Sequence, residues 1–235
     1  MDVLVDLVVP VKELRRAKSR LAPAVADLPG DDASREQAHR ALAHALARDT
    51  LRAARAAERT GRLVVVTTEP AEQLGAGGPW ETVRDTGGGL NAALRRGADH
   101  LRRTGSREHA LAVLQADLPA LRPDELDEAL ARAAARFAEG ATSAFVADHA
   151  GTGTTLLVAA PRHPLRPRFG PGSAAAHAAS GAVALDGAWP GLRGDVDTPG
   201  DLARARDLGV GPHTRAWPDP PTATAVGAPA RETAC

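Results

Sequence analysis

Short apolar runs alternate along the chain with stretches whose apolar residues recur at helical spacing. The run Val3–Val9 ends at Pro10 and contains one acid, which is typical of a buried strand in a parallel sheet. Similar patterns predict strands over residues 63–67, 82–83 and 110–115. Capping signals and helical periodicity predict helices over residues 34–57, 90–103, 123–137 and 199–207. This alternation predicts an α/β fold, a three-layer α/β/α sandwich with a mostly parallel sheet.

Two later apolar runs differ from this alternation. Residues 142–147 and 154–160 are separated by a short polar connection, which predicts a hairpin and thus an antiparallel insertion in the sheet. A chain of 235 residues suits one domain of this class. Beyond residue 211 the chain is rich in Pro, Ala and Thr without periodicity. We therefore expect a domain over residues 1–211 and a disordered tail over residues 212–235.

The charge balance narrows the range of partners. Lys plus Arg and Asp plus Glu both total 29, so the net charge favours neither nucleic acid nor an anionic membrane as a partner. No apolar run approaches the ~18 residues that span a bilayer, and we expect a cytoplasmic protein. The single cysteine, Cys235, excludes an intrachain disulfide and a cysteine metal site. The sequence leaves the oligomeric state open.

The composition marks a few positions as unusual. The chain has 27 Arg but only two Lys, Lys12 and Lys18, and one Asn, Asn91. Depletion of residues with AT-rich codons indicates a GC-rich gene that uses Arg wherever a positive charge suffices. Lys is a compact point charge, whereas Arg is a planar fork. The two lysines therefore predict a site where phosphate oxygens approach closely.

Acidic residues follow several of the predicted strands. Ligands of open α/β sheets bind beyond the carboxyl ends of the strands, where Asp85, Asp117, Asp148 and Asp197 are expected. Asp117 comes directly after an apolar strand, and Mg²⁺ takes one or two carboxylates together with substrate phosphates. Asp195 and Asp197 lie on either side of Val196, just before the helix predicted at residues 199–207. We expect Asp197 to face the cleft and Asp195 to support it or to be solvated.

Three uncharged loops complete the candidate site. Gly87–Gly89 lies between Asp85 and Asn91, and its amides could approach a nucleotide closely. The segments Gly151–Thr155 and Phe169–Ser173 combine backbone amides with hydroxyls, which suits a small carboxylate or phosphate, and Ser173 could also cap a helix. The histidines form no zinc or nucleophile motif, and a Walker A sequence is absent, which argues against hydrolase and zinc functions.

Seven segments, taken in order, carry a family resemblance. They are Val9–Lys12, Ala17–Leu21, Asp85–Asn91, Ala116–Pro119, Gly151–Leu156, Phe169–Ser173 and Asp195–Pro199. Together they resemble the guanylyltransferases of deazaflavin coenzyme F-420 biosynthesis, which activate 2-phospho-L-lactate or phosphoenolpyruvate. The resemblance spans about residues 3 to 208 and implies a MobA-like nucleotidyltransferase fold, as in molybdopterin guanylyltransferases.

The resemblance also implies roles for individual residues. It implies that Asp117 and Asp197 carry Mg²⁺, and that Gly170, Ser173 and one threonine hold the phosphorylated acid. We expect that threonine to be Thr155, with Thr154 as the alternative. The residues expected at the GTP nucleotide are Pro10, Lys12, Lys18, Asp85, Gly88, Gly89 and Asn91. Those expected to act in catalysis are Lys12, Lys18, Arg20, Asp117 and Asp197.

The expected reaction is in-line attack by the acid's phosphate on the α-phosphorus of GTP. A phosphate monoester is already ionised near neutral pH, with a second pKa of ~6, so no general base is needed. The GC-rich composition suits a high-GC bacterium, where the resembled enzymes use phosphoenolpyruvate, but 2-phospho-L-lactate and a phosphoglycerate stay open. A molybdopterin or sugar-phosphate acceptor is an alternative, although such relatives usually have a Gly-rich loop where this chain has Val9–Lys12. A catalytically inactive nucleotide-binding regulator is another.

Overall fold

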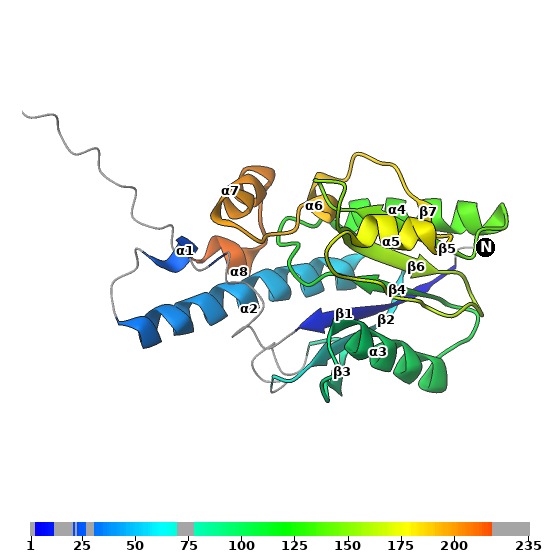
Figure 1. The fold of residues 1–235 in the computed structure, drawn as a ribbon, viewed down its shortest axis with the longest axis horizontal. Helices are drawn as coiled ribbons and strands as arrows, with labels where there is room; N and C mark the ends of the chain where they lie inside the picture. Colours follow the sequence, from blue (N-terminus) through cyan, green and yellow to red (C-terminus); the bar gives the residue numbers. More distant parts are fainter. Residues whose placement is uncertain (1–2, 12–20, 22, 27–30, 70–77, 218–235) are drawn as a thin grey trace, which may run out of the picture.

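The computed structural model describes residues 3–11, 21, 23–26, 31–69 and 78–217. The strands in this part of the chain form one sheet of seven, in the order β3-β2-β1-β4-β6-β5-β7 (Figure 1). Their bounds are β1 Val5–Val11, β2 Thr60–Thr67, β3 Glu81–Arg84, β4 Ala110–Leu114, β5 Ser143–Ala147, β6 Thr154–Ala159 and β7 Val183–Ala184.

The directions of the strands determine which strand ends lie together at one edge of the sheet. β1 is parallel to β2 and β4, and β2 is parallel to β3. β6 is antiparallel to both β4 and β5, whereas β7 is parallel to β5. The expected mostly parallel sheet with an antiparallel insertion is therefore confirmed. Because β6 is reversed, its first residue, Thr154, lies at the same edge as the carboxyl ends of the other strands.

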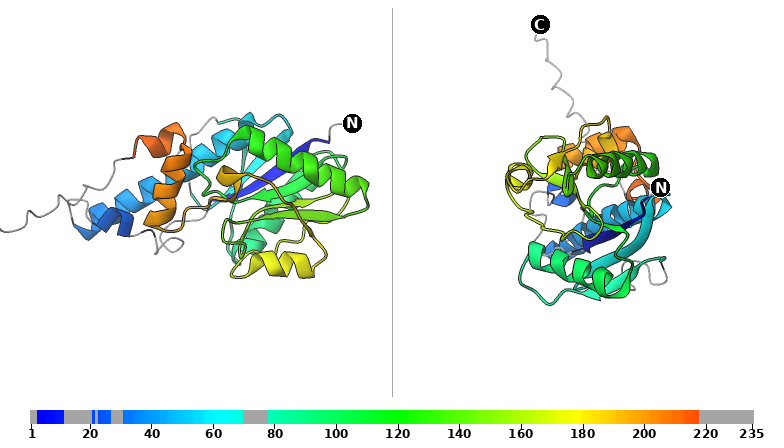
Figure 2. Two further views of the ribbon diagram at one scale, coloured as in Figure 1. Left: turned by 90° about the horizontal axis from the view of Figure 1, so that it is seen from above. Right: turned by 90° about the vertical axis from the view of Figure 1, so that its right-hand side faces the viewer.

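Helices cover both faces of the sheet, as the two views in Figure 2 show. On one face, α2 (Asp32–Ala56) and α4 (Pro123–Ala138) bury Leu51 and Leu130 in one core cluster. On the other, α3 (Leu90–Thr104) and α5 (Ser173–Ala179) contribute to a second cluster. A Cβ at Gly97 would come within 2.5 Å of Val8, so α3 packs closely against β1. The three-layer prediction is confirmed.

A third apolar cluster, which includes Leu46 on α2 and Leu202, packs against Trp217, beyond the expected domain end. Short helices α1 (Pro23–Ala26) and α6 (Pro190–Arg193) precede α7 (Pro199–Leu208) and α8 (Pro212–Arg215) in the chain. Buried Asp49 on α2 accepts the backbone N–H groups of His213 (3.1 Å) and Thr214 (2.7 Å). The predicted boundary at residue 211 was therefore too early, because a buried carboxylate far away in sequence holds α8. Residues 218–235 lie outside the described residues.

Two element ends also differ from the prediction. α2 begins at Asp32 because Asp31 is the N-cap, and the Asp31 side chain accepts the N–H of Ser34. β1 continues through Pro10 to Val11. The pairing of β1 with β4 ends at Val8, so Pro10 has one neighbouring strand, and its missing N–H is tolerated there. Among the described helices, none is both long and apolar enough to cross a membrane.

Candidate active site

The turn after β4 carries Asp117, and Thr50 on α2 holds it in place. Thr50 is fully buried, and its Oγ1 accepts the Leu118 N–H at 2.9 Å. Its hydroxyl proton is shared between the Leu46 carbonyl at 2.9 Å and the Ala116 carbonyl at 3.1 Å. These bonds fix the backbone on both sides of Asp117. Thr50 was not among the predicted site residues, although a hydroxyl on the buried face of a helix is a signal for such a role.

Carboxylates from separate segments meet beside this turn. The Val196 N–H donates to the Asp117 carbonyl at 3.0 Å, which brings residues 195–197 alongside. Burial raises the pKa of Asp195 to about 7, and repulsion from Asp117, Asp197 and Asp148 adds to the shift. Several negative charges therefore share one place at the carboxyl edge of the sheet, as expected from the strand ends.

Asp195 and Asp197 lie in different surroundings, and the role expected of each stays a prediction. Asp195 is half-buried among the other carboxylates, whereas Asp197 is exposed. The segment is not a strand but leads into α7. The N–H groups of Asp197 and Thr198 both donate to Asp201, at 3.2 and 2.9 Å, and Thr198 and Asp201 form a capping box.

The donor set at this cluster fits magnesium. Carboxylate oxygens are its preferred protein ligands, and a divalent cation would relieve the repulsion that adds to the effect of burial on the pKa of Asp195. Within the described ranges, no three His, Cys, Asp or Glu side chains form a preformed metal cage. Magnesium does not need one, since it typically takes one or two carboxylates and completes its shell with phosphate oxygens and water.

The glycine loop after β3 is held by the side chains of flanking residues. Asp85 Oδ1 accepts the Gly87 N–H at 2.9 Å and lies 3.4 Å from the Arg96 guanidinium. Gly88 and Gly89 have φ values of 87° and 86°, which favour glycine, and both are exposed. The loop is thus preorganised at the start of α3, and nucleotide binding by Asp85, Gly88 and Gly89 stays a prediction.

Asn91 has a partner that the sequence analysis did not foresee. Its Nδ2 donates to the Phe169 carbonyl and its Oδ1 accepts the Phe169 N–H, both at 2.9 Å. The expected contact of Asn91 with the nucleotide stays a prediction, and these two hydrogen bonds do not favour it.

The segments expected to hold the acid lie together at the start of β6. Thr154 Oγ1 accepts from Ser173 Oγ at 3.2 Å and lies 2.9 Å from His177 Nδ1. Thr155 Oγ1 is buried without a hydrogen-bond partner among the described residues. Ser173 is the first residue of α5 and not its cap, because Gly172 occupies the cap position and the Ser173 hydroxyl points to Thr154. Gly170, with a φ of 143°, is exposed.

His177 is the central residue of this network and was missed as a functional residue. Its side chain is fully buried, and its Nε2 accepts the Arg168 N–H at 3.0 Å. The proton must then be on Nδ1, which donates to Thr154. Burial lowers the pKa of His177 to about 4, and the nearby Arg168 charge contributes. The imidazole is therefore neutral at physiological pH.

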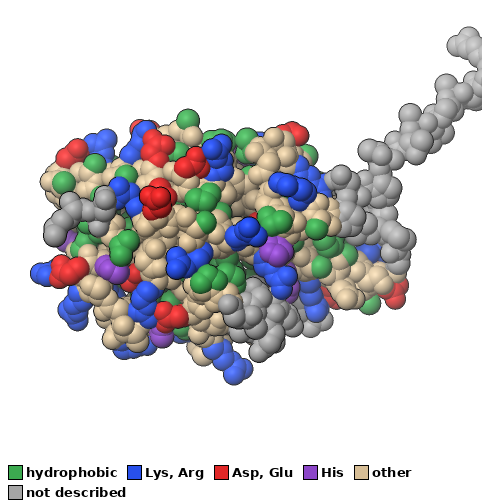
Figure 3. All heavy atoms as spheres, turned by 180° about the vertical axis from the view of Figure 1, so that it is seen from behind, with side chains coloured by type: hydrophobic (Ala, Val, Ile, Leu, Met, Phe, Trp, Pro, Cys, Tyr) green, Lys and Arg blue, Asp and Glu red, His purple; other side chains and the backbone are tan. Residues whose placement is uncertain are grey.

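The remaining predicted residues cannot all be placed. Lys12, Lys18 and Arg20 lie outside the described residues. Pro10 is buried near the carboxyl end of β1. Figure 3 shows basic and acidic side chains interspersed over one face, in agreement with the balanced composition.

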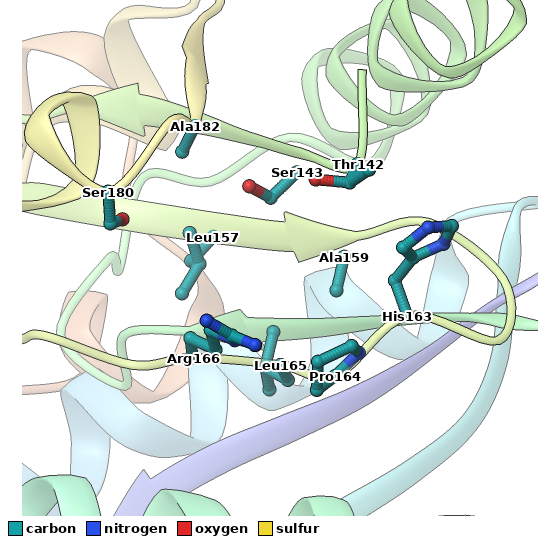
Figure 4. A pocket seen from close by; sticks show the side chains of 10 residues that line it. All are labelled: Thr142, Ser143, Leu157, Ala159, His163, Pro164, Leu165, Arg166, Ser180 and Ala182. Carbon is teal, nitrogen blue, oxygen red and sulfur yellow. The ribbon is translucent and has the colours of Figure 1, made fainter. Parts of the chain in front are cut away.

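A cavity of about 210 Å³ lies elsewhere in the molecule (Figure 4). Its wall includes Ser143, at the start of β5, and Ala159, at the end of β6. These residues are at the edge of the sheet opposite Thr154, so this cavity is separate from the carboxylates. We assign the candidate site to the carboxyl edge, where the charged and hydroxyl groups converge.

Solved structures share this fold at low sequence identity. A nucleotidyl transferase from Methanothermobacter aligns with a TM-score of 0.57 and 20% identity, covering 87% of this chain and 96% of that one. A putative nucleotide-diphospho-sugar transferase from Desulfovibrio desulfuricans gives a TM-score of 0.55 with 13% identity, covering 84% of each chain. These similarities support the fold assignment alone.

Sequence comparison identifies the family. The model of the MobA-like NTP transferase domain matches residues 28–185. Proteins named phosphoenolpyruvate guanylyltransferase are 52% identical in Geodermatophilus obscurus, covering 90% of this chain and 92% of the relative, and 51% identical in Streptomyces scabiei, covering 89% and 94%. A third, from Salinispora arenicola, is 48% identical over 88% and 90%. The chain is thus a nucleotidyltransferase that belongs to the MobA-like NTP transferase family, within the group of phosphoenolpyruvate guanylyltransferases.

Proposed function

We propose that this protein transfers GMP from GTP to phosphoenolpyruvate and releases pyrophosphate, as a step of coenzyme F-420 biosynthesis. The main observation behind the proposal is that carboxylates and hydroxyl groups lie at the same edge of the sheet. The carboxylates around Asp195 suit a metal that accompanies phosphates, and the hydroxyls of Thr154, Thr155 and Ser173 suit a small anion. The names of relatives that are about half identical support the choice of GTP and phosphoenolpyruvate.

The reaction exchanges one phosphoanhydride bond for another. An oxygen of the acid's phosphate forms a bond to the α-phosphorus of GTP. The bond from the α-phosphorus to the bridging oxygen breaks, and pyrophosphate leaves with its electron pair. The attacking phosphate is already ionised, so the protein supplies position and charge and no general base.

Thr155 is the favoured contact for the acid. Its buried hydroxyl has no partner in the described part of the chain, and an unsatisfied buried polar group costs about 1–3 kcal/mol. An oxygen of the bound acid would remove that cost. Thr154 already accepts from Ser173 and His177, so it is better suited to orienting Ser173 than to binding alone. Gly170 would contribute its exposed backbone.

A second set of residues would neutralise or balance the negative charge of the nucleotide. Lys12, Lys18 and Arg20 would neutralise the triphosphate. Asp117 and Asp197 would hold Mg²⁺, and their charges act on the neighbouring Asp195 carboxylate. When bound, the metal supplies positive charge at the phosphate oxygens during the transfer.

A substrate matrix tests the proposal. Purified protein is incubated with each of the four ribonucleoside triphosphates and with phosphoenolpyruvate, 2-phospho-L-lactate or 3-phosphoglycerate, with Mg²⁺ or with EDTA, and pyrophosphate is measured. Release with GTP, phosphoenolpyruvate and Mg²⁺ is expected. Release only with CTP or UTP, or only with a sugar phosphate or molybdopterin added as acceptor, would contradict it. No release with any pair would favour a nucleotide-binding regulator.

A further inference from the structure

The segment that leads into Gly170 and Ser173 is held by side chains from two separate helices. Asn91 lies in the first turn of α3, and His177 lies in α5. They bond to the backbone of two consecutive residues, Asn91 to Phe169 and His177 to Arg168. None of these three bonds belongs to regular secondary structure, and within the described part of the chain no backbone group bonds to Arg168 or Phe169, so these side chains fix the segment there.

Asn91 holds Phe169 at two points. Its carboxamide bonds to the carbonyl and to the N–H of the same residue, each at 2.9 Å. This pairing needs one donor and one acceptor at the end of a short side chain, which Asn provides. Asp would retain the acceptor but lose the donor and place a charge against the Phe169 carbonyl, and Gln would be one methylene too long.

His177 holds the preceding residue and the ring of Phe169. Its Nε2 accepts the Arg168 N–H at 3.0 Å, and the Phe169 ring packs edge-on against the imidazole with 5.1 Å between centroids. On the other side of the imidazole, Nδ1 bonds to Thr154, which accepts from Ser173. One neutral ring thus connects the backbone at Arg168 to the hydroxyls of the proposed acid site.

We infer that Asn91 and His177 act as positioning residues, which together form a clamp that sets residues 168–173 for binding the phosphorylated acid. Asn91 follows Leu90, the first residue of α3, so this helix supplies one of the two supports of the acid segment. The inference rests on the proposed function for the identity of the acid. It assigns the single asparagine to the acid side of the site.

Steady-state kinetics separate this role from nucleotide contact. The variants Asn91→Asp, Asn91→Ala and His177→Gln should raise KM for phosphoenolpyruvate about tenfold or more, whereas KM for GTP should stay within about twofold of wild type. Arg95→Gln, on the exposed side of α3, is the matched control and should change neither constant. A rise in KM for GTP with an unchanged KM for the acid would overturn the inference and return Asn91 to the nucleotide.

The double variant tests whether the two residues act on one segment. If both hold residues 168–169, the rise in KM for phosphoenolpyruvate in the double variant Asn91→Ala with His177→Gln should be smaller than the product of the rises in the two single variants, because either change already frees the segment. Rises in KM that multiply would show two independent effects and would contradict a shared clamp.

Hydrogen exchange of the ligand-free protein tests the clamp without any substrate. The amide of Phe169 should exchange at least about tenfold faster in Asn91→Ala, and that of Arg168 in His177→Gln, whereas amides in β4 should keep their wild-type rates. Unchanged rates at Arg168 and Phe169 would overturn the clamp. If wild type does not act on GTP and phosphoenolpyruvate, the proposed function fails, and the exchange rates still decide the clamp.

Discussion

Acid should destabilise this protein partly through His177, which is fully buried and bonded at both ring nitrogens. Protonation of Nε2 would break its bond to the Arg168 N–H and place a charge in an apolar setting beside Phe145 and Phe169. We compare wild type with His177→Gln, which removes the titrating group.

The magnitude follows from the pKa. The folded protein lowers the pKa of His177 from 6.5 to about 4, so between these values the unfolded chain binds a proton that the folded chain does not. The free energy of unfolding therefore falls as the pH falls through this window, by about 1.4 kcal/mol per unit and by about 3 kcal/mol in all at most. Above pH 6.5 His177 is neutral in both the folded and the unfolded chain, so the free energy of unfolding keeps its full value there.

Urea unfolding between pH 4 and 8 measures the effect. The difference in unfolding free energy between wild type and His177→Gln should be largest at pH 7 to 8 and should shrink by up to about 3 kcal/mol towards pH 4. The control His149→Gln changes an exposed histidine and should stay within about 0.5 kcal/mol of wild type. A wild-type to His177→Gln difference that does not vary with pH would refute a buried, neutral His177.

Three further predictions follow from the site and the fold. Asp195→Asn should raise the melting temperature at pH 8 without Mg²⁺ more than at pH 5. Burial and neighbouring acids raise the pKa of Asp195 to about 7, so the folded wild type loses stability as the pH rises from about 4 to 7. A variant with a lower melting temperature than wild type at pH 8 would contradict this. Lys12→Arg and Lys18→Arg should each reduce turnover about tenfold, about 1.4 kcal/mol, if the lysines touch the triphosphate, and wild-type rates in both would remove them from the site. Deletion of residues 218–235 should leave the melting temperature unchanged. Deletion of residues 212–235 should lower it by several degrees, because Asp49 loses its partners in α8. Equal melting temperatures for the two truncated proteins would count against docking of α8.

Local signals in the sequence were enough to predict most elements. Apolar runs identified β1, β2 and β4, and the Thr198 to Asp201 spacing identified the start of α7, because these features depend on neighbouring residues only. The hairpin of β5 and β6 was also predictable, but its place in the sheet was not. β6 lies between β4 and β5 through pairings such as Val113 with Leu157, which no local pattern specifies.

The candidate site was predicted by residue type more successfully than by partner. Asp117 and Asp148 were expected at the strand ends, and both contribute to the carboxylate cluster. The role of Asn91 depends on Phe169, 78 positions away, and His177 lies in an Ala-rich helix with no motif to mark it. Such roles arise from tertiary contacts, so a sequence pattern could not reveal them.

The central claim is most directly tested by identifying the product. ³¹P NMR of a reaction containing GTP, phosphoenolpyruvate, Mg²⁺ and the protein should show two coupled resonances of a new diphosphate together with one equivalent of pyrophosphate. Asp117→Asn serves as the control and should give neither. GTP and phosphoenolpyruvate that persist unchanged, or GTP that is converted to GDP while the acid stays a phosphate monoester, would contradict guanylyl transfer to this acid.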